Sequence, residues 1–228
     1  MSRLRKLIIG DIRFQMKYGF YLVYVIFTIF YICLLFAFPE NIRGKVASIM
    51  IYTDPAAMGL FFMGAIVLFE KSQRVLNSIA VSPVTVKEYI LSKLISLSLI
   101  GTLVGVVIAA ASGSGNMPSV ILGTLLGSFM FSLFGLIAAA LVNTLNQFMV
   151  VTMPFELLCM LPPMIYLFGY RERFMLLHPG CIIILLIEGK ALPNPLQLLY
   201  VCLWIALITY ITYRIVRRMF SSVGGVKL

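Results

Sequence analysis

The sequence predicts an all-α integral membrane protein in which six transmembrane helices form one transmembrane domain over residues 1–228. Hydrophobic residues make up 61% of the 228 residues, charged residues make up 11%, and the mean hydropathy is +1.05. A soluble domain is only about half apolar and about one-quarter charged. Apolar runs of about 20 residues, the length that crosses a bilayer, account for most of the chain. Little remains for a separate soluble domain.

Six apolar runs give the predicted crossings. The second run is short, so we expect its helix to begin upstream near Ile49 or to continue into the polar segment that follows it. Asp54 before Pro55 predicts a helix start, because Asp is a favoured N-cap residue and proline fits the first helical position. The predicted crossings are residues 20–38, 55–69, 89–111, 120–142, 148–168 and 196–216.

The basic residues predict the orientation. Thirteen of the 18 Lys and Arg residues fall on the side that carries both termini and the segment after the second crossing. The positive-inside rule therefore places both termini in the cytoplasm of a multi-pass plasma-membrane protein. The net charge of +10 then reflects topology and contact with anionic lipids, and it requires no nucleic-acid partner. The thirteen residues are Arg3, Arg5, Lys6, Arg13, Lys17, Lys71, Arg74, Lys87, Lys93, Arg214, Arg217, Arg218 and Lys227.

The first polar segment, residues 3–17, predicts an amphipathic helix that lies in the membrane interface. Its apolar arc contains leucine, isoleucine and phenylalanine, and basic residues lie opposite. Asp11 and Gln15 project into the apolar arc, so the face is imperfect. A basic tail beside the membrane is the simpler alternative.

The second polar segment, residues 70–93, interrupts two apolar runs. Val75, Leu76 and Ile79 share one helical face. Ser82-Pro83 biases the chain out of a helix, and Thr85 with Glu88 forms a capping box that starts the next helix. This pattern predicts a short helix at the cytoplasmic surface within residues 70–83. The alternative is an ordinary connector whose apolar face rests on the bilayer.

Two further patterns concern packing. Small residues recur at four-residue spacing in the third and fourth crossings, which lets helix backbones approach closely. Residues 170–195 contain two apolar stretches too short to cross, which predicts a partly re-entrant external region that is packed against protein. His178 between them is expected to be a loop residue. The small residues are Gly101, Gly105, Ala109, Gly123, Gly127, Gly135 and Ala139.

The sequence offers no catalytic centre. It contains no G-x-x-x-x-G-K-[ST] phosphate-binding loop, and its one histidine excludes a histidine-based zinc cluster. We expect neither enzymatic activity nor a bound cofactor or metal. Glu156 is the one carboxylate that sequence reasoning places well inside a crossing, about 12 Å from the cytoplasmic end. It is either a polar point on a substrate path or a partner in a hydrogen bond between helices.

The first crossing carries an aromatic stripe. Aromatic residues separated by four or seven positions recur along one helix face, at Phe20, Tyr24, Phe27, Tyr31 and Phe38. Such a stripe is more often a packing or lipid-facing surface than a ligand track, and both interpretations stay open.

One stretch resembles a known family. Residues 69–93, FEKSQRVLNSIAVSPVTVKEYILSK, are similar to the segment between spans 2 and 3 of type-2 ABC transporter permeases, in the branch that includes fluoroquinolone-export permeases. The shared features are the charged pair after span 2, the amphipathic turn, Ser-Pro-Val and Tyr-x-x-Ser-Lys. The order of an interfacial helix, six spans and a re-entrant external region is also similar.

The resemblance implies a half-transporter of an ATP-driven exporter. It implies a second permease subunit, identical or paralogous, and separate P-loop ATPase subunits that bind ATP and Mg²⁺. Residues 3–17 would be the elbow helix and residues 70–83 the coupling helix seated on the ATPase. The implied coupling residues are Glu70, Lys71, Arg74, Val75, Leu76 and Ile79. The implied substrate path or dimer interface contains Phe20, Tyr24, Phe27, Tyr31 and Glu156.

Substrate identity does not follow from the resemblance, because such permeases export drugs, lipids, polysaccharides and peptides. Short external loops favour a small amphiphile or drug. The competing hypothesis is a self-contained secondary carrier or channel that uses Glu156 as its proton or ion site. The absence of a clear inverted repeat and the single buried acid argue against that hypothesis.

Overall fold

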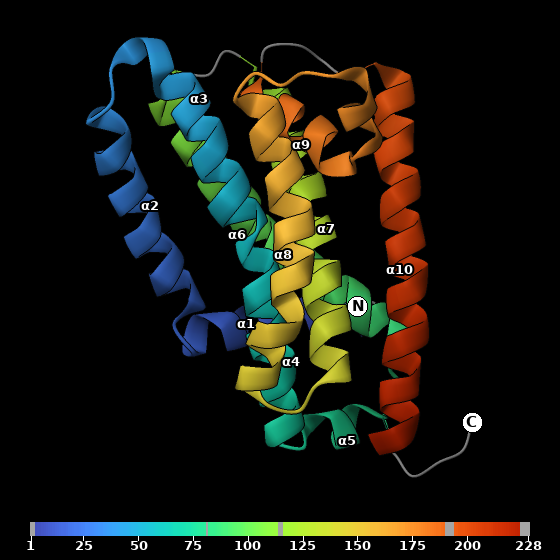
Figure 1. Ribbon diagram of the computed structural model, residues 1–228. Helices are drawn as coiled ribbons and strands as arrows, with labels where there is room; N and C mark the ends of the chain where they lie inside the picture. The colour runs from blue at the N-terminus through green and yellow to red at the C-terminus, as the bar shows by residue number, and fades with distance from the viewer. Residues whose placement is uncertain (1–2, 81, 114–115, 190–193, 224–228) are drawn as a thin grey trace.

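The computed structural model describes residues 3–80, 82–113, 116–189 and 194–223, and these ranges form helices joined by short turns, without a β-strand (Figure 1). The predicted all-α fold class is confirmed. The elements are α1 (Arg3–Lys17), α2 (Phe20–Phe36), α3 (Glu40–Ile51), η1 (Tyr52–Ala56), α4 (Met58–Ser72), α5 (Val75–Ala80), α6 (Val86–Ala111), α7 (Met117–Leu141), α8 (Leu145–Leu167), η2 (Arg173–Leu177), α9 (Pro179–Glu188) and α10 (Pro195–Val223).

Within the described ranges, five helices are long and apolar enough to cross a membrane. They are the continuous helix formed by α3, η1 and α4, together with α6, α7, α8 and α10. α1 and α2 form a pair with a bend of 65° between them, and counting this pair as one crossing gives six. α2 alone is about 25 Å long, slightly shorter than the bilayer hydrocarbon core of about 30 Å. The chain is therefore a multi-pass membrane protein.

The second crossing continues into the polar segment, as predicted, but it begins further upstream than predicted. It is one helix of 33 residues, Glu40–Ser72, so it begins nine residues before Ile49. Asp54 is not an N-cap, because it lies inside η1, a five-residue π-helix that contains Pro55. Proline lacks a backbone N–H and crowds the preceding turn, and a π-turn accommodates this with wider hydrogen bonding. The prediction of a helix start at Asp54 is wrong.

α7 is the central helix of the bundle. It packs against α4, α6, α9, α10 and η1, and its membrane-crossing part is mostly buried, in contrast to α8 and α10. Glycines make these contacts close, as their spacing predicts. A Cβ atom at Gly101 would lie 2.6 Å from the Pro55 carbonyl oxygen, and one at Gly135 would collide with the Leu60 backbone. α6 and α7 therefore touch the broken helix backbone to backbone.

The described part of residues 170–195, the predicted re-entrant region, contains two short helices. η2 contains the first apolar stretch, residues 174–177, and α9 contains the second, residues 181–187, and is almost entirely buried. The Ser119 hydroxyl donates a hydrogen bond of 2.9 Å to the Leu186 carbonyl, which holds α9 against α7. The His178 Nδ1 accepts a hydrogen bond of 3.2 Å from the Gly180 N–H and caps α9. Residues 190–193 of this region lie outside the described residues.

The bundle has two distinct ends (Figure 1). The α5 end carries α1, α5 and the C-terminal turns of α10, and the α9 end carries η2, α9 and the start of α3. The thirteen basic residues predicted on one side belong to segments at the α5 end, apart from Lys227, which lies outside the described residues.

The contact between α4 and α7 generates the first prediction. Gly135→Ala should destabilise the protein by about 1–3 kcal/mol, because the added methyl group forces two helix backbones apart. Thermal unfolding of the purified protein in detergent measures this change. Gly44→Ala is the matched control, since a Cβ atom there meets nothing within 4 Å. Equal melting temperatures for the two variants would contradict the close approach.

Candidate functional site

The predicted surface helix is α5, Val75–Ala80, which lies across the end of the bundle (Figure 1). It packs on α4 and α10. The Leu76 side chain is 1% exposed and points into the protein, Ile79 is partly buried, and Val75 is 39% exposed. Leu76 and Ile79 therefore form part of the predicted apolar face, whereas Val75 lies outside it, and the helix is shorter than residues 70–83. Residue 81 lies outside the described residues.

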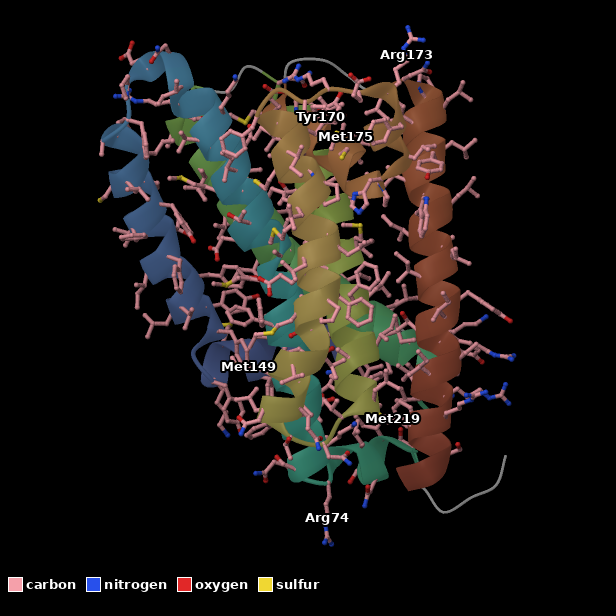
Figure 2. All side chains as sticks on the ribbon, in the orientation of Figure 1. Arg74, Met149, Tyr170, Arg173, Met175 and Met219 are labelled. Atoms are coloured by element: carbon pink, nitrogen blue, oxygen red, sulfur yellow. The ribbon has the colours of Figure 1, made fainter. Side chains whose placement is uncertain are left out.

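Arg74 turns the chain between α4 and α5. Its backbone φ is +56°, in the left-handed region that non-glycine residues rarely adopt. The side chain is exposed and points away from the bundle (Figure 2). A sharp turn at this position presents a guanidinium group at the tip of the α5 end.

Lys71 has an internal role. Its ammonium group donates hydrogen bonds to three carbonyl oxygens at the end of α7, at 2.7 Å to Ala139, 3.1 Å to Ala140 and 2.7 Å to Val142. These are carbonyl groups that a helix C-terminus leaves unpaired, and a cation there complements the helix dipole. Lys71 thus joins the end of α4 to the end of α7.

Glu70 is also engaged inside the protein. Its carboxylate accepts a 2.6 Å hydrogen bond from Lys93 Nζ and a 2.7 Å hydrogen bond from the Tyr89 hydroxyl. The Lys93 Nζ lies 3.1 Å from Asp11 Oδ1 as well. The side chain of Lys93 is 2% exposed. One buried ammonium group therefore bridges carboxylates from α1 and α4, and we call Asp11, Glu70, Tyr89 and Lys93 the junction cluster.

Two neighbouring contacts extend the attachment of α1. The Gln15 side-chain amide donates a 2.9 Å hydrogen bond to the Ser96 hydroxyl on α6, and Arg3 donates one of 3.0 Å to the Pro83 carbonyl. Asp11 and Gln15 are the residues that made the apolar arc of the N-terminal helix imperfect. Both face α6, so the polar interruptions in the arc are the attachment points of α1.

Sequence reasoning treated Lys93 only as a basic residue of the topology and as part of Tyr-x-x-Ser-Lys. A signal was present, because a lysine two turns into an apolar helix needs a partner. The partners are 82 residues away at Asp11 and 23 residues away at Glu70. One sequence gives no means of pairing residues over such distances.

The aromatic stripe of α2 divides into two parts. Phe20 and Tyr24 make edge-to-face contacts with Phe62 of α4, with ring centroids 4.9 and 5.0 Å apart. Phe27 and Tyr31 stack on each other at 6.1 Å, and Phe27 is exposed. The first pair attaches α2 to the bundle, and the second leaves a partly open aromatic surface.

Glu156 lies on the open face of α8. It is half-buried and lines an apolar groove of about 490 Å³ on that face. No ion pair found among the described residues involves it. Phe155, the preceding residue, stacks on Phe134 of α7 at 5.2 Å and fixes the rotation of α8. The other residues lining the groove are Met153, Leu157, Met160, Leu161 and Met164.

Asp54 is a second carboxylate inside a crossing, which sequence reasoning missed. It is 6% exposed and lies in η1 rather than at a helix terminus. An Asp-Pro pair is typical of a helix start, so the local pattern favours a capping residue at Asp54 over a buried carboxylate. The argument that only one acid is buried is therefore wrong.

Comparison with known proteins decides the family. Residues 2–223 match the sequence model of the fluoroquinolones export permease protein family. The chain belongs to this family. It is also 26% identical over 172 residues, 74% of this chain and 72% of the relative, to the fluoroquinolones export permease proteins of Mycobacterium tuberculosis strains CDC 1551 / Oshkosh and H37Rv. The predicted resemblance to fluoroquinolone-export permeases is confirmed. As a member of this family, the protein is a membrane component of a transporter.

The junction cluster generates the second prediction. Lys93→Met should destabilise this permease by about 3–5 kcal/mol, because the buried Glu70 carboxylate and the partly buried Asp11 carboxylate lose their counter-charge. Thermal unfolding measures the stability, and limited trypsin cleavage at Arg13 and Lys17 reports release of α1.

A neutral variant separates charge from packing. Asp11→Asn, Glu70→Gln and Lys93→Met together should recover most of the lost stability, because no uncompensated charge stays buried. If Lys93→Met unfolds at the wild-type temperature with α1 still protected from trypsin, the cluster does not hold α1.

Proposed function

We propose that this permease is one half of an ATP-driven exporter. It forms a substrate path with a second permease subunit, identical or paralogous, and it is driven by separate P-loop ATPase subunits that bind and hydrolyse ATP with Mg²⁺. The observation that carries the proposal is the construction of the α5 end. An exposed short helix sits there on a buried ionic junction that joins α1, α4 and α6.

The contacts of α5 support a coupling role. α5 presents Arg74 and Val75 outward, while Leu76 anchors it to the bundle. Glu70 and Lys71 fix the base of the α5 turn to α6 and α7. A displacement of α5 by a partner would therefore move α4 and, through Lys93, also α1 and α6. Among the six implied coupling residues, we assign direct ATPase contact to Arg74 and Val75 and a positioning role to the others.

The charge distribution supports a cytoplasmic α5 end. The described basic residues of the predicted cytoplasmic side belong to segments at that end, and short loops rich in Lys and Arg remain in the cytoplasm. This orientation places both termini of the chain, and α5, on the side of the membrane where ATP is present.

The open faces of α2 and α8 support a dimer. Much of α8 is exposed apolar surface, which lipid alone could cover. A half-buried Glu156 in that surface favours protein instead, because a carboxylate that faces lipid is costly. We place α8 and the Phe27–Tyr31 surface of α2 at the interface with the second permease subunit, where they line the substrate path.

The names of the relatives support the substrate class. Two relatives are named as fluoroquinolones export permeases, which favours a small amphiphilic drug. The apolar grooves between and along the helices suit such a molecule better than a sugar polymer or a long peptide.

The third prediction concerns the ATPase. Arg74→Glu should reduce co-purification of a P-loop ATPase from the native host by roughly tenfold, because a charge contact becomes a repulsion. A mild-detergent pull-down of the tagged chain measures the ATPase recovered per permease. Arg173→Glu is the matched control, an exposed arginine at the α9 end that also points away from the bundle (Figure 2).

Recovery of the wild-type chain alone in the same pull-down would contradict the proposal. If wild-type chain inserts in the membrane and is recovered without any ATPase, the exporter proposal fails. Transport driven by an ion gradient without ATP would then favour the carrier alternative.

The fourth prediction concerns the dimer. In a chain without its native cysteines, Leu157→Cys on α8 should give a disulfide-linked dimer on mild oxidation in the membrane. Leu203→Cys on α10 should not. The two leucines are equally exposed in the single chain, at 60% and 61%. Crosslinking at Leu203 but not at Leu157 would place the interface on α10 and contradict this arrangement.

A further inference from the structure

Asp54 lies inside the second crossing, far from both ends of the 33-residue helix. It belongs to the π-helix η1, which packs against α6 and α7. π-turns within α-helices occur frequently at functional sites. An ionisable residue at this depth is costly unless a partner or ligand compensates it.

The protein compensates Asp54 only in part. The carboxyl group interacts with the Tyr31 side chain of α2. Its Oδ2 atom is buried and accepts no hydrogen bond within the described residues. None of the ion pairs found in the described ranges includes Asp54. The carboxyl group therefore retains acceptor capacity that no basic side chain fills.

Tyr24 is a second incompletely paired group at the same place. Its side chain is 1% exposed, and its hydroxyl has no hydrogen-bond partner in the described structure. It interacts electrostatically with Asp54. Buried hydroxyl groups are nearly always hydrogen-bonded in proteins. Two unfilled polar groups that interact electrostatically give this place unused hydrogen-bonding capacity, which a ligand that is polar at one end would fill.

Tyr24 also lines a groove, and it is the residue through which Asp54 and Tyr31, which are not among the described lining residues, adjoin that groove. A groove of about 520 Å³ runs between α2 and α6, and its lining is apolar except for Tyr21, Tyr24 and Thr28. Leu99 and Leu103 on its α6 wall are more than half exposed, so the groove opens sideways toward the membrane. Its volume is in the range of small-molecule sites, about 300–1,000 Å³.

We propose that Asp54, Tyr24 and Tyr31 bind the ammonium group of a cationic amphiphile whose apolar part occupies the groove between α2 and α6. A carboxylate supplies the counter-charge and the two hydroxyl groups accept hydrogen bonds from N–H. Aromatic rings beside them attract a cation through their faces. The inference rests on the proposed exporter function, because the amphiphile would be a substrate that enters from the bilayer.

A direct binding measurement tests the site without any ATPase. The full chain in lipid nanodiscs is titrated with a dansyl-labelled alkyl primary amine and, separately, with its N-acetylated neutral counterpart. Wild-type protein should bind the amine about tenfold or more tightly than the neutral probe, because hydrogen bonds to charged groups are strong. This comparison needs no variant, so it stands even if a substitution at Asp54 prevents folding.

Variants locate the site. Asp54→Asn should abolish the preference for the amine while leaving affinity for the neutral probe unchanged, and Tyr31→Phe should reduce the preference by a smaller factor. Glu40→Gln is the control, an exposed acid at the start of the same helix. Equal affinity of wild type for both probes, or an Asp54→Asn protein that keeps the preference, would overturn the proposal.

The result of the amine titration does not depend on the result of the ATPase pull-down. Failure to recover an ATPase with the wild-type chain would overturn the proposed function and leave the binding result unaffected. Recovery of the ATPase with no preference for the amine would overturn the Asp54 site alone.

Discussion

The arrangement of the α5 end depends on one buried ammonium group. Lys93 of α6 contacts Asp11 of α1 and Glu70 of α4, and so fixes an interfacial helix, a membrane crossing and the base of α5 to one another. Charges held in a low-dielectric interior tolerate little change in distance. The three helices are therefore expected to move together when α5 is displaced.

The membrane part of the fold follows a different constraint. Helices in lipid gain nothing from hydrophobic burial against one another, so they associate through close packing and polar contacts. Gly101 and Gly135 place α6 and α7 directly on the backbone of the broken helix, and α7 occupies the centre. α8 and part of α2 retain open surface. The packed core carries the exposed faces that form the proposed dimer interface, the Glu156 surface and the groove beside Tyr24.

Local patterns predicted much of this structure. The capping box forms with both of its hydrogen bonds: the Thr85 N–H donates to the Glu88 carboxylate at 2.8 Å, and the Glu88 N–H donates to the Thr85 hydroxyl at 3.3 Å. The small-residue faces make close contacts between helices, as their spacing predicts. Prediction failed where a distant segment decides the outcome. Asp54 lies in a π-turn, and the Pro55 carbonyl oxygen of that turn occupies the position beside α6 that is left open because residue 101 is a glycine. Lys71, one of the implied coupling residues, also caps a helix 68 residues away in the sequence, a contact that the local pattern does not predict. Periodicity and turn signals report only the neighbouring residues along the chain.

The most direct test of the account uses permease and ATPase reconstituted together in vesicles, with ATP-driven drug transport and ATP hydrolysis measured in parallel. The variant is the neutral junction cluster, Asp11→Asn, Glu70→Gln and Lys93→Met, which retains packing without ionic bridges. The account predicts that this variant still assembles with the ATPase and hydrolyses ATP but transports much less drug per ATP than the wild type. Wild-type transport efficiency in the neutral variant would contradict the claim that the buried junction transmits movement from α5.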